Sequence, residues 1–118
     1  MRNLPTTLWI AAAFAVAVLT AGIPSQLSAA EPAAMSHTIE IKKFKFHPDK
    51  LEVSLGDKIV WINRDIVPHT ATANDKSWDS KLIAKDAKWE TVVNADMLEN
   101  YFCRFHPNMK GGVSIVVK

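Results

Sequence analysis

Cysteine is almost absent from this chain of 118 residues. Cys103 is the single cysteine, so no disulfide can form within the chain. The sequence also lacks internal repeats and low-complexity segments, and its length suits one domain. A lone thiol in an exported protein calls for a specific explanation, because oxidising compartments favour paired cysteines. Burial, a bridge to another chain or a bound metal are the three explanations that the sequence leaves open.

The chain also lacks a large excess of charge of either sign. Fourteen Lys and Arg residues face twelve Asp and Glu residues, for a formal net charge of +2. This balance gives no reason to expect nucleic-acid binding, which needs a strongly basic face. Lys42, Lys43 and Lys45 cluster, and we interpret them as a solvated strand face. The sequence contains no catalytic triad and no cluster of carboxylates, so we expect no enzyme activity.

The first thirty residues have the pattern of a targeting segment. Arg2 provides a positive start, residues 8–19 are almost continuously apolar, and Ser28-Ala29-Ala30 offers the small residues that a signal peptidase requires. We expect residues 1–30 to be a cleavable signal peptide and residues 31–118 to be the mature domain. The alternative is an uncleaved membrane anchor, but the apolar run is short for a span of roughly 20 residues.

The mature domain has the hydrophobic pattern of half-buried strands. Beyond residue 34 the dominant period is two, as where Ile39 and Ile41 alternate with Glu40 and Lys42. Residues 75–88 are polar and irregular and predict a long connection. The pattern therefore predicts an all-β domain, an antiparallel sandwich or barrel, with strands within residues 39–42, 51–55, 58–63, 69–72, 89–93, 100–103 and 113–117.

A run near the C-terminus sets three metal-ligating residue types three positions apart. Cys103, His106 and Met109 lie in the connection between the last two expected strands. Thiolate, imidazole and thioether together form a soft site, and a trigonal set of two histidines and one cysteine with a weak axial methionine is the blue-copper arrangement. His69, which follows Pro68, is the best candidate for the second histidine. The sequence therefore predicts one copper ion, cycling between Cu(I) and Cu(II).

Each of these residues also has a simpler interpretation when it is taken alone. Cys103 is then a small buried hydrophobe, Met109 a filler of the core and His106 a loop cap. The combination at equal spacing favours a metal site. Zinc is the other metal to weigh, but methionine is not a usual zinc ligand and structural zinc sites are richer in thiolate.

The mature chain resembles the cupredoxins of the plastocyanin and amicyanin group over nearly its whole length. Residues 46–57, residues 60–65 and the segment Pro68-His69-Thr70 resemble the segments that lead to the first ligand in that group. The run 103–109 resembles the short ligand loop of amicyanins, because plastocyanins and pseudoazurins place more residues between the histidine and the methionine. The resemblance implies a cupredoxin-like Greek-key β-sandwich of eight strands with a type 1 copper site at one end, and the ligands His69, Cys103, His106 and Met109.

The resemblance also implies a function and a compartment. It implies a periplasmic, monomeric electron carrier that binds a redox donor and a redox acceptor transiently, with no membrane attachment after signal cleavage. Two departures concern the surroundings of the site: Phe105 replaces the proline of amicyanins before the second histidine, and Thr70 replaces the usual asparagine after the first. We expect the Thr70 hydroxyl to hydrogen-bond across to the cysteine loop.

A second function is left open by the sequence, namely copper storage or delivery. Such sites are usually rich in methionine or histidine, and the mature chain has no histidine tract. We therefore favour the carrier, with His106 near the surface as the point where electrons leave. Its expected apolar surroundings are Pro68, Phe105, Pro107 and Met97.

Overall fold

The computed structural model describes residue 3, residues 11–26, residue 28 and residues 32–117, in two units that divide at residue 30. In the first unit, residues 11–26 contain no helix or strand. No helix among the described residues is long and apolar enough to cross a membrane. Ala29 and Ala30, where we expect cleavage, lie outside the described residues, so the signal peptide remains a prediction.

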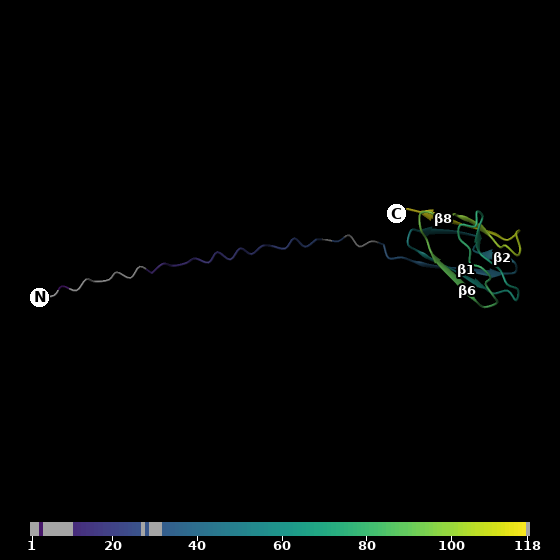
Figure 1. The fold of residues 1–118 in the computed structure, drawn as a ribbon, viewed down its shortest axis with the longest axis horizontal. Coiled ribbons are helices and arrows are strands. Elements are labelled where there is room, and N and C mark those ends of the chain that lie inside the picture. Colours follow the sequence, from purple (N-terminus) through teal and green to yellow (C-terminus); the bar gives the residue numbers. More distant parts are fainter. Residues whose placement is uncertain (1–2, 4–10, 27, 29–31, 118) are drawn as a thin grey trace. The chain divides into compact units, whose positions relative to one another are not determined.

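The second unit is a sandwich of eight strands in two four-stranded sheets (Figure 1). One sheet has the order β2-β1-β4-β6 and the other the order β3-β8-β7-β5. Figure 1 shows β8 in one layer and β1 with β6 in the other. The all-β prediction is therefore confirmed. The strands are β1 (Ser36–Lys42), β2 (Lys45–His47), β3 (Lys50–Ser54), β4 (Lys58–Asn63), β5 (Thr72–Ala73), β6 (Lys88–Val92), β7 (Asn100–Phe102) and β8 (Lys110–Val116).

Both sheets are mixed, whereas alternation alone predicted antiparallel pairing. β1 pairs with β4 in parallel and β3 pairs with β8 in parallel, while the remaining neighbours are antiparallel. The parallel pairs arise because consecutive strands cross between the two sheets, so that a strand returns beside an earlier one in the same direction. Hydrophobic period reports which residues face the core but does not report strand direction.

The core lies between the two sheets. β4 is a central strand, and its Ile59, Val60 and Trp61 are all buried, so the strand carries buried apolar side chains on both of its faces. Trp61 packs on Trp78, Trp89 and Tyr101, with ring centroids 5.3 to 5.6 Å apart. This aromatic cluster gives a domain without disulfides much of its buried apolar area.

Two segments differ from the pattern-based prediction. The three-residue strand β2 was not predicted, since alternation over three residues is too short to recognise. Residues 69–71, which were predicted as part of a strand, form only an isolated bridge between His69 and Ile83, and β5 begins at Thr72. The long connection that was predicted over residues 75–88 is present as residues 74–87 between β5 and β6, and these residues contain no helix.

The two histidines outside the expected site differ in their surroundings. His47 is exposed, whereas His37 is half-buried and its Nε2 lies 2.8 Å from Asp57 Oδ2. The backbone N–H groups of Met35 and Ser54 also donate to the Asp57 carboxylate, and together with His37 they lower its pKa to about 2. Asp57 thus joins the start of β1 to the turn between β3 and β4.

Candidate metal centre

Three donor atoms from distant parts of the chain converge at one end of the sandwich. Cys103 Sγ lies 3.7 Å from Nδ1 of His69 and 3.7 Å from Nδ1 of His106, and the two Nδ1 atoms are 3.2 Å apart. His69 and Cys103 are buried and His106 is half-buried. This is the one group of three or more such side chains at metal-binding distances among the described residues.

The triangle of donors has the size that a metal ion requires. Its centre lies about 2 Å from each of the three atoms, which is close to the bond lengths of about 2.0 Å to nitrogen and about 2.3 Å to sulfur known for zinc. Two imidazole nitrogens and one thiolate in a trigonal arrangement are the donor set of a blue-copper site. The triangle therefore has the size of a transition-metal site, and its donor chemistry fits a copper ion.

Two backbone hydrogen bonds in the loop 103–109 repeat the three-residue spacing of its candidate ligands. The His106 N–H donates to the Cys103 carbonyl at 3.2 Å, and the Met109 N–H donates to the His106 carbonyl at 2.8 Å. The Cys103 N–H in turn donates to the Met109 carbonyl at 3.1 Å and closes the loop. The first two bonds each span three residues, as in a tight turn, and the third spans six. The loop therefore brings its candidate ligands onto one side without a longer chain segment.

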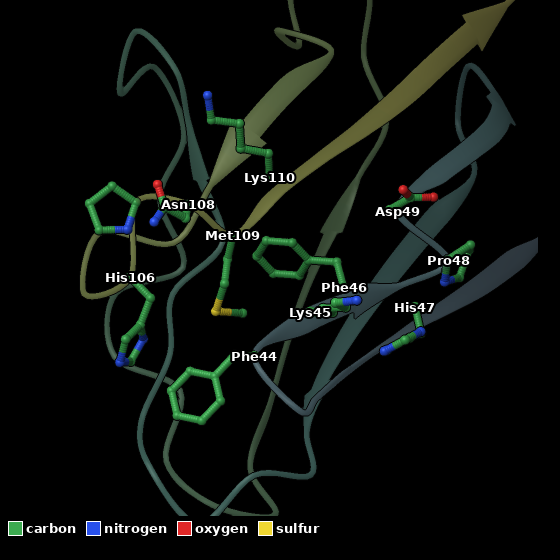
Figure 2. A pocket seen from close by; sticks show the side chains of 11 residues that line it. Phe44, Lys45, Phe46, His47, Pro48, Asp49, His106, Asn108, Met109 and Lys110 are labelled. Carbon is green, nitrogen blue, oxygen red and sulfur yellow. The ribbon is translucent and has the colours of Figure 1, made fainter.

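Met109 is buried beneath the loop, with 5% of its surface exposed. Figure 2 shows its thioether directed toward the side on which the rings of His106 and Phe44 lie. This orientation suits a weak axial ligand that approaches the plane of the three donors from one side. The axial role of Met109 remains a proposal, taken up below.

Thr70 joins His69's strand segment to the cysteine loop, as predicted. Its backbone N–H donates to Cys103 Sγ at 3.3 Å, and its hydroxyl accepts the Arg104 N–H at 2.8 Å. A hydrogen bond to the sulfur withdraws charge from a thiolate, and such outer contacts orient the ligands and tune the metal. Both contacts are buried or half-buried, so the two segments are held together before a metal binds.

Asp79 extends this brace to Arg104. The Thr72 hydroxyl donates to Asp79 Oδ1 at 3.0 Å, and Arg104 Nε lies 3.2 Å from Asp79 Oδ2. Burial by itself raises the pKa of Asp79, but the hydrogen bonds from Lys81 and Thr72 and the charge of Arg104 lower it overall. Arg104 is therefore ion-paired within the molecule rather than free to attract an acidic partner.

Asp65 holds the far nitrogen of His69. His69 Nε2 lies 2.8 Å from Asp65 Oδ2, which leaves Nδ1 to face the metal. Burial raises the pKa of Asp65, but hydrogen bonds from the Phe44 N–H, from His69 and from the Lys43 N–H hold it below its ordinary value. A carboxylate behind a ligating histidine fixes its tautomer and increases its basicity. Asp65 was not among the residues predicted from the sequence, although its position four residues before His69 is compatible with such a contact.

The expected apolar rim is only partly correct. Phe105 is 45% exposed, and Pro68 and Pro107 are exposed as well. Met97 is 7% exposed and belongs to the hydrophobic core, so its assignment to the rim was wrong. Its burial was not visible in the sequence. Phe44 lies over the two histidines instead, with ring centroids 5.5 Å from His69 and 4.9 Å from His106.

A groove of about 870 Å³ runs between β2 and the ligand loop (Figure 2). Met109 and Phe46 line its inner part, and Lys45, Asp49 and Lys110 stand around its edge. Phe44 and His106 border the end of the groove that is nearest the metal site. The groove therefore gives the metal end of the sandwich a concave, mostly apolar surface with two lysines beside it.

The model of one protein family matches residues 33–116 of the chain. This family is described as copper binding proteins of the plastocyanin/azurin family. The match spans all eight strands and the donor residues. The chain belongs to the plastocyanin/azurin family of copper-binding proteins. This family agrees with the resemblance that the loop 103–109 indicated, and the cupredoxin is expected to carry one copper ion.

Among characterised relatives, the cupredoxin is similar to amicyanin from Paracoccus denitrificans. The two are 28% identical over 102 residues, which cover 80% of this chain and 78% of the relative. Amicyanin from Paracoccus versutus is 23% identical over 94 residues, covering 75% and 71%. The predicted likeness to amicyanins is confirmed.

Solved structures support the same fold. A reduced proline-to-phenylalanine variant of amicyanin is 30% identical, covers 69% of this chain and 82% of its own, and has a TM-score of 0.58. A purple cupredoxin from Nitrosopumilus maritimus, 24% identical, covers 68% of this chain and 99% of its own with a TM-score of 0.62. At that identity the second likeness supports the fold alone. The prediction of a cupredoxin-like sandwich is confirmed.

Proposed function

We propose that this cupredoxin is an exported blue-copper protein that carries single electrons between redox proteins of the periplasm. His69, Cys103 and His106 would hold the copper ion through their clustered donor atoms, with Met109 as a weaker fourth ligand. The observation that carries the proposal is the triangle of one sulfur and two Nδ1 atoms, with sides of 3.2 to 3.7 Å. When bound there, copper supplies a one-electron Cu(I)/Cu(II) couple.

The protein contributes a site whose shape is fixed by hydrogen bonds. Asp65 holds His69, Thr70 holds both the Cys103 sulfur and the next residue of the loop, and the loop closes on itself. Ligands that are held from several sides move little when the charge of the metal changes. Small movement keeps the reorganisation energy low, and rapid electron transfer depends on a low reorganisation energy.

Exposed apolar residues around His106 suit brief contacts with partner proteins. Phe44 meets the half-buried imidazole edge to face, Phe105 and Pro107 flank His106 in the chain, and Pro68 precedes His69; all four are exposed. Redox complexes bury small areas and are weak, so a few apolar side chains at their centre decide docking. We propose that donor and acceptor use this surface in turn and that the carrier acts as a monomer. A carrier of this kind catalyses no reaction of its own.

Copper storage or delivery is the alternative function. The mature chain has three methionines and no histidine tract, and the described residues hold a single cluster of metal-binding side chains. A protein that exchanges copper needs an open site, whereas His69 and Cys103 are 0% exposed. These observations favour the carrier.

Replacement of the thiolate tests this proposal. The protein with copper should be blue, lose its colour with a reductant and regain it with an oxidant, because a copper–thiolate bond gives an intense charge-transfer band. Cys103→Ser should abolish this band while the far-ultraviolet circular dichroism of the β-sandwich is retained. A variant that stays blue would refute the assignment of Cys103. Colourless Cu(I) binding by the unsubstituted protein would favour storage or delivery.

A further inference from the structure

The turn between β1 and β2 has an unusual backbone. Lys43 has a φ of 51° and Phe44 a φ of 57°, so two successive residues with side chains adopt the left-handed conformation. Hairpin turns of this kind normally carry glycine or asparagine at both central positions, since other residues are strained there. Such strain is retained only where the surroundings impose it, and it occurs preferentially at functional sites.

Asp65 is the residue that imposes this conformation. Its Oδ1 accepts the Lys43 N–H at 2.7 Å and its Oδ2 accepts the Phe44 N–H at 3.0 Å. Asp65 is itself held, because its own N–H donates to Asn63 Oδ1 at 2.9 Å, and the Asn63 amide donates to the Ile83 carbonyl at 2.9 Å. The strained turn is thus tied to the rigid end of β4.

The turn places the ring of Phe44 across the mouth of the metal site. The ring meets both imidazoles edge to face, at an interplanar angle of 88° to His69 and 88° to His106. Figure 2 shows Phe44 beside His106 and on the side toward which the Met109 sulfur points. The ring is 51% exposed. An aromatic ring that is half-exposed and held in a strained turn gains little for the core, so its value lies in what it covers.

The same carboxylate binds the turn and a candidate ligand. Asp65 Oδ2 accepts from His69 Nε2 at 2.8 Å as well as from the Phe44 N–H. We propose that Phe44 is a lid over the two histidines and that Asp65 is the positioning residue that holds both the lid and His69, so that together they control how fast copper enters and leaves. The inference rests on the proposed copper site but not on electron transfer as the function.

The physical reason is access to the donor atoms. A chelator or a water molecule must approach between the imidazoles to displace them from the metal, and the Phe44 ring occupies this approach. Removal of the ring exposes His106 and the metal to competing ligands. Loss of the carboxylate frees both the ring and the far nitrogen of His69. Outer contacts of this kind typically change metal affinity by about 10- to 100-fold.

Two glycine variants separate the ring from the turn. Glycine adopts positive φ without strain, so Phe44→Gly keeps the turn and removes the ring, while Lys43→Gly keeps both the turn and the ring. The measurement is the rate of Cu(I) transfer from the loaded protein to bicinchoninate, followed by the colour of the chelate. We expect Phe44→Gly to release copper at least about tenfold faster and Lys43→Gly to match the unsubstituted protein. Equal rates for the two variants would overturn the lid.

Asp65→Asn tests the positioning role by a readout that does not need copper. Hydrogen exchange of the metal-free protein should show faster exchange of the Lys43 and Phe44 amides, because both lose a charged acceptor. The loaded variant should also release copper faster. Unchanged amide exchange would show that Asp65 does not hold the turn. If the unsubstituted protein binds copper without colour, the electron-carrier proposal fails, while the release rates still decide the lid.

Discussion

At the scale of single residues, the site joins donors in the loop 103–109 to a carboxylate and an aromatic ring that come from other segments of the chain. Cys103, His106 and Met109 were recognisable because three soft or nitrogen donors recur at equal spacing in one connection. Phe44 and the hold of Asp65 on the turn were not recognisable, since the Phe44 and Lys43 amides lie 21 and 22 residues from Asp65 along the chain. Such a contact forms only when the chain folds, and no local sequence pattern predicts it.

Met109 provides the prediction that belongs to this scale. Met109→Leu should keep copper and colour but raise the reduction potential, because loss of the thioether weakens Cu(II) binding more than Cu(I) binding. Each tenfold difference between the two affinities corresponds to about 59 mV for one electron. Voltammetry measures the change. Met97→Leu is the matched control, since Met97 is buried in the core and its substitution should leave the potential unchanged. An unchanged potential in Met109→Leu would mean that Met109 only fills space.

At the scale of strands, hydrophobic alternation identified most strands, but it missed β2 and did not predict the direction of pairing. β4 was predicted with its observed ends, because a continuous β-branched and aromatic run is unmistakable. β2 was missed, since it has three residues and the turn before it contains Lys43 and Phe44 rather than glycine or asparagine. The parallel pairings of β1 with β4 and of β3 with β8 could not be predicted from the sequence either, because strand direction depends on how strands cross between sheets.

The pairing of β7 with β8 requires a glycine at one position. Gly111 lies opposite Tyr101 in the register, and a Cβ atom there would lie 2.3 Å from the Tyr101 ring. Tyr101 cannot move away, because it is buried against Trp61 and Phe46. The ring therefore rests on the bare backbone of β8, and any side chain at this position would displace it.

Gly111→Ala should therefore destabilise the protein by about 1 to 3 kcal/mol, the usual cost of overpacking a core. Gly112→Ala is the neighbouring control, since a Cβ there would meet its nearest atom at 3.6 Å and alanine favours an ordered backbone. Urea unfolding of both variants in the same metal state gives the comparison. A Gly111→Ala midpoint at or above that of Gly112→Ala would contradict this account.

At the scale of the whole molecule, the two ends of the sandwich have different tasks. One end carries Asp57, which joins β1 to the turn after β3 through three hydrogen bonds and serves stability. The other end carries the candidate ligands, the strained turn and most of the exposed apolar rim. The sequence predicted the fold class and the ligand cluster because both depend on residue type and spacing. It did not predict which apolar residues face outward. Met97 and Phe105 are both apolar residues in connections, and only the fold shows that Met97 is buried and Phe105 is exposed.

The exposed rim leads to a prediction about electron exchange with partners. Phe105 precedes His106, is 45% exposed and should lie at the centre of a docking surface. Phe105→Glu introduces a charge that must lose water on docking, so we expect electron exchange with a redox partner protein to slow by about tenfold or more, a cost of about 1.4 kcal/mol at the interface. The visible spectrum should stay nearly unchanged, because Phe105 is not a ligand.

Val92→Glu is the control: Val92 is 55% exposed but pairs with Lys58 at the start of β4, whereas His69 follows the end of that strand. Stopped-flow kinetics beside the absorption spectrum decides. Loss of the visible absorption band in Phe105→Glu would show that the Phe105 ring supports the structure of the site. Equal rates of electron exchange in the two variants would show that electrons leave through another face.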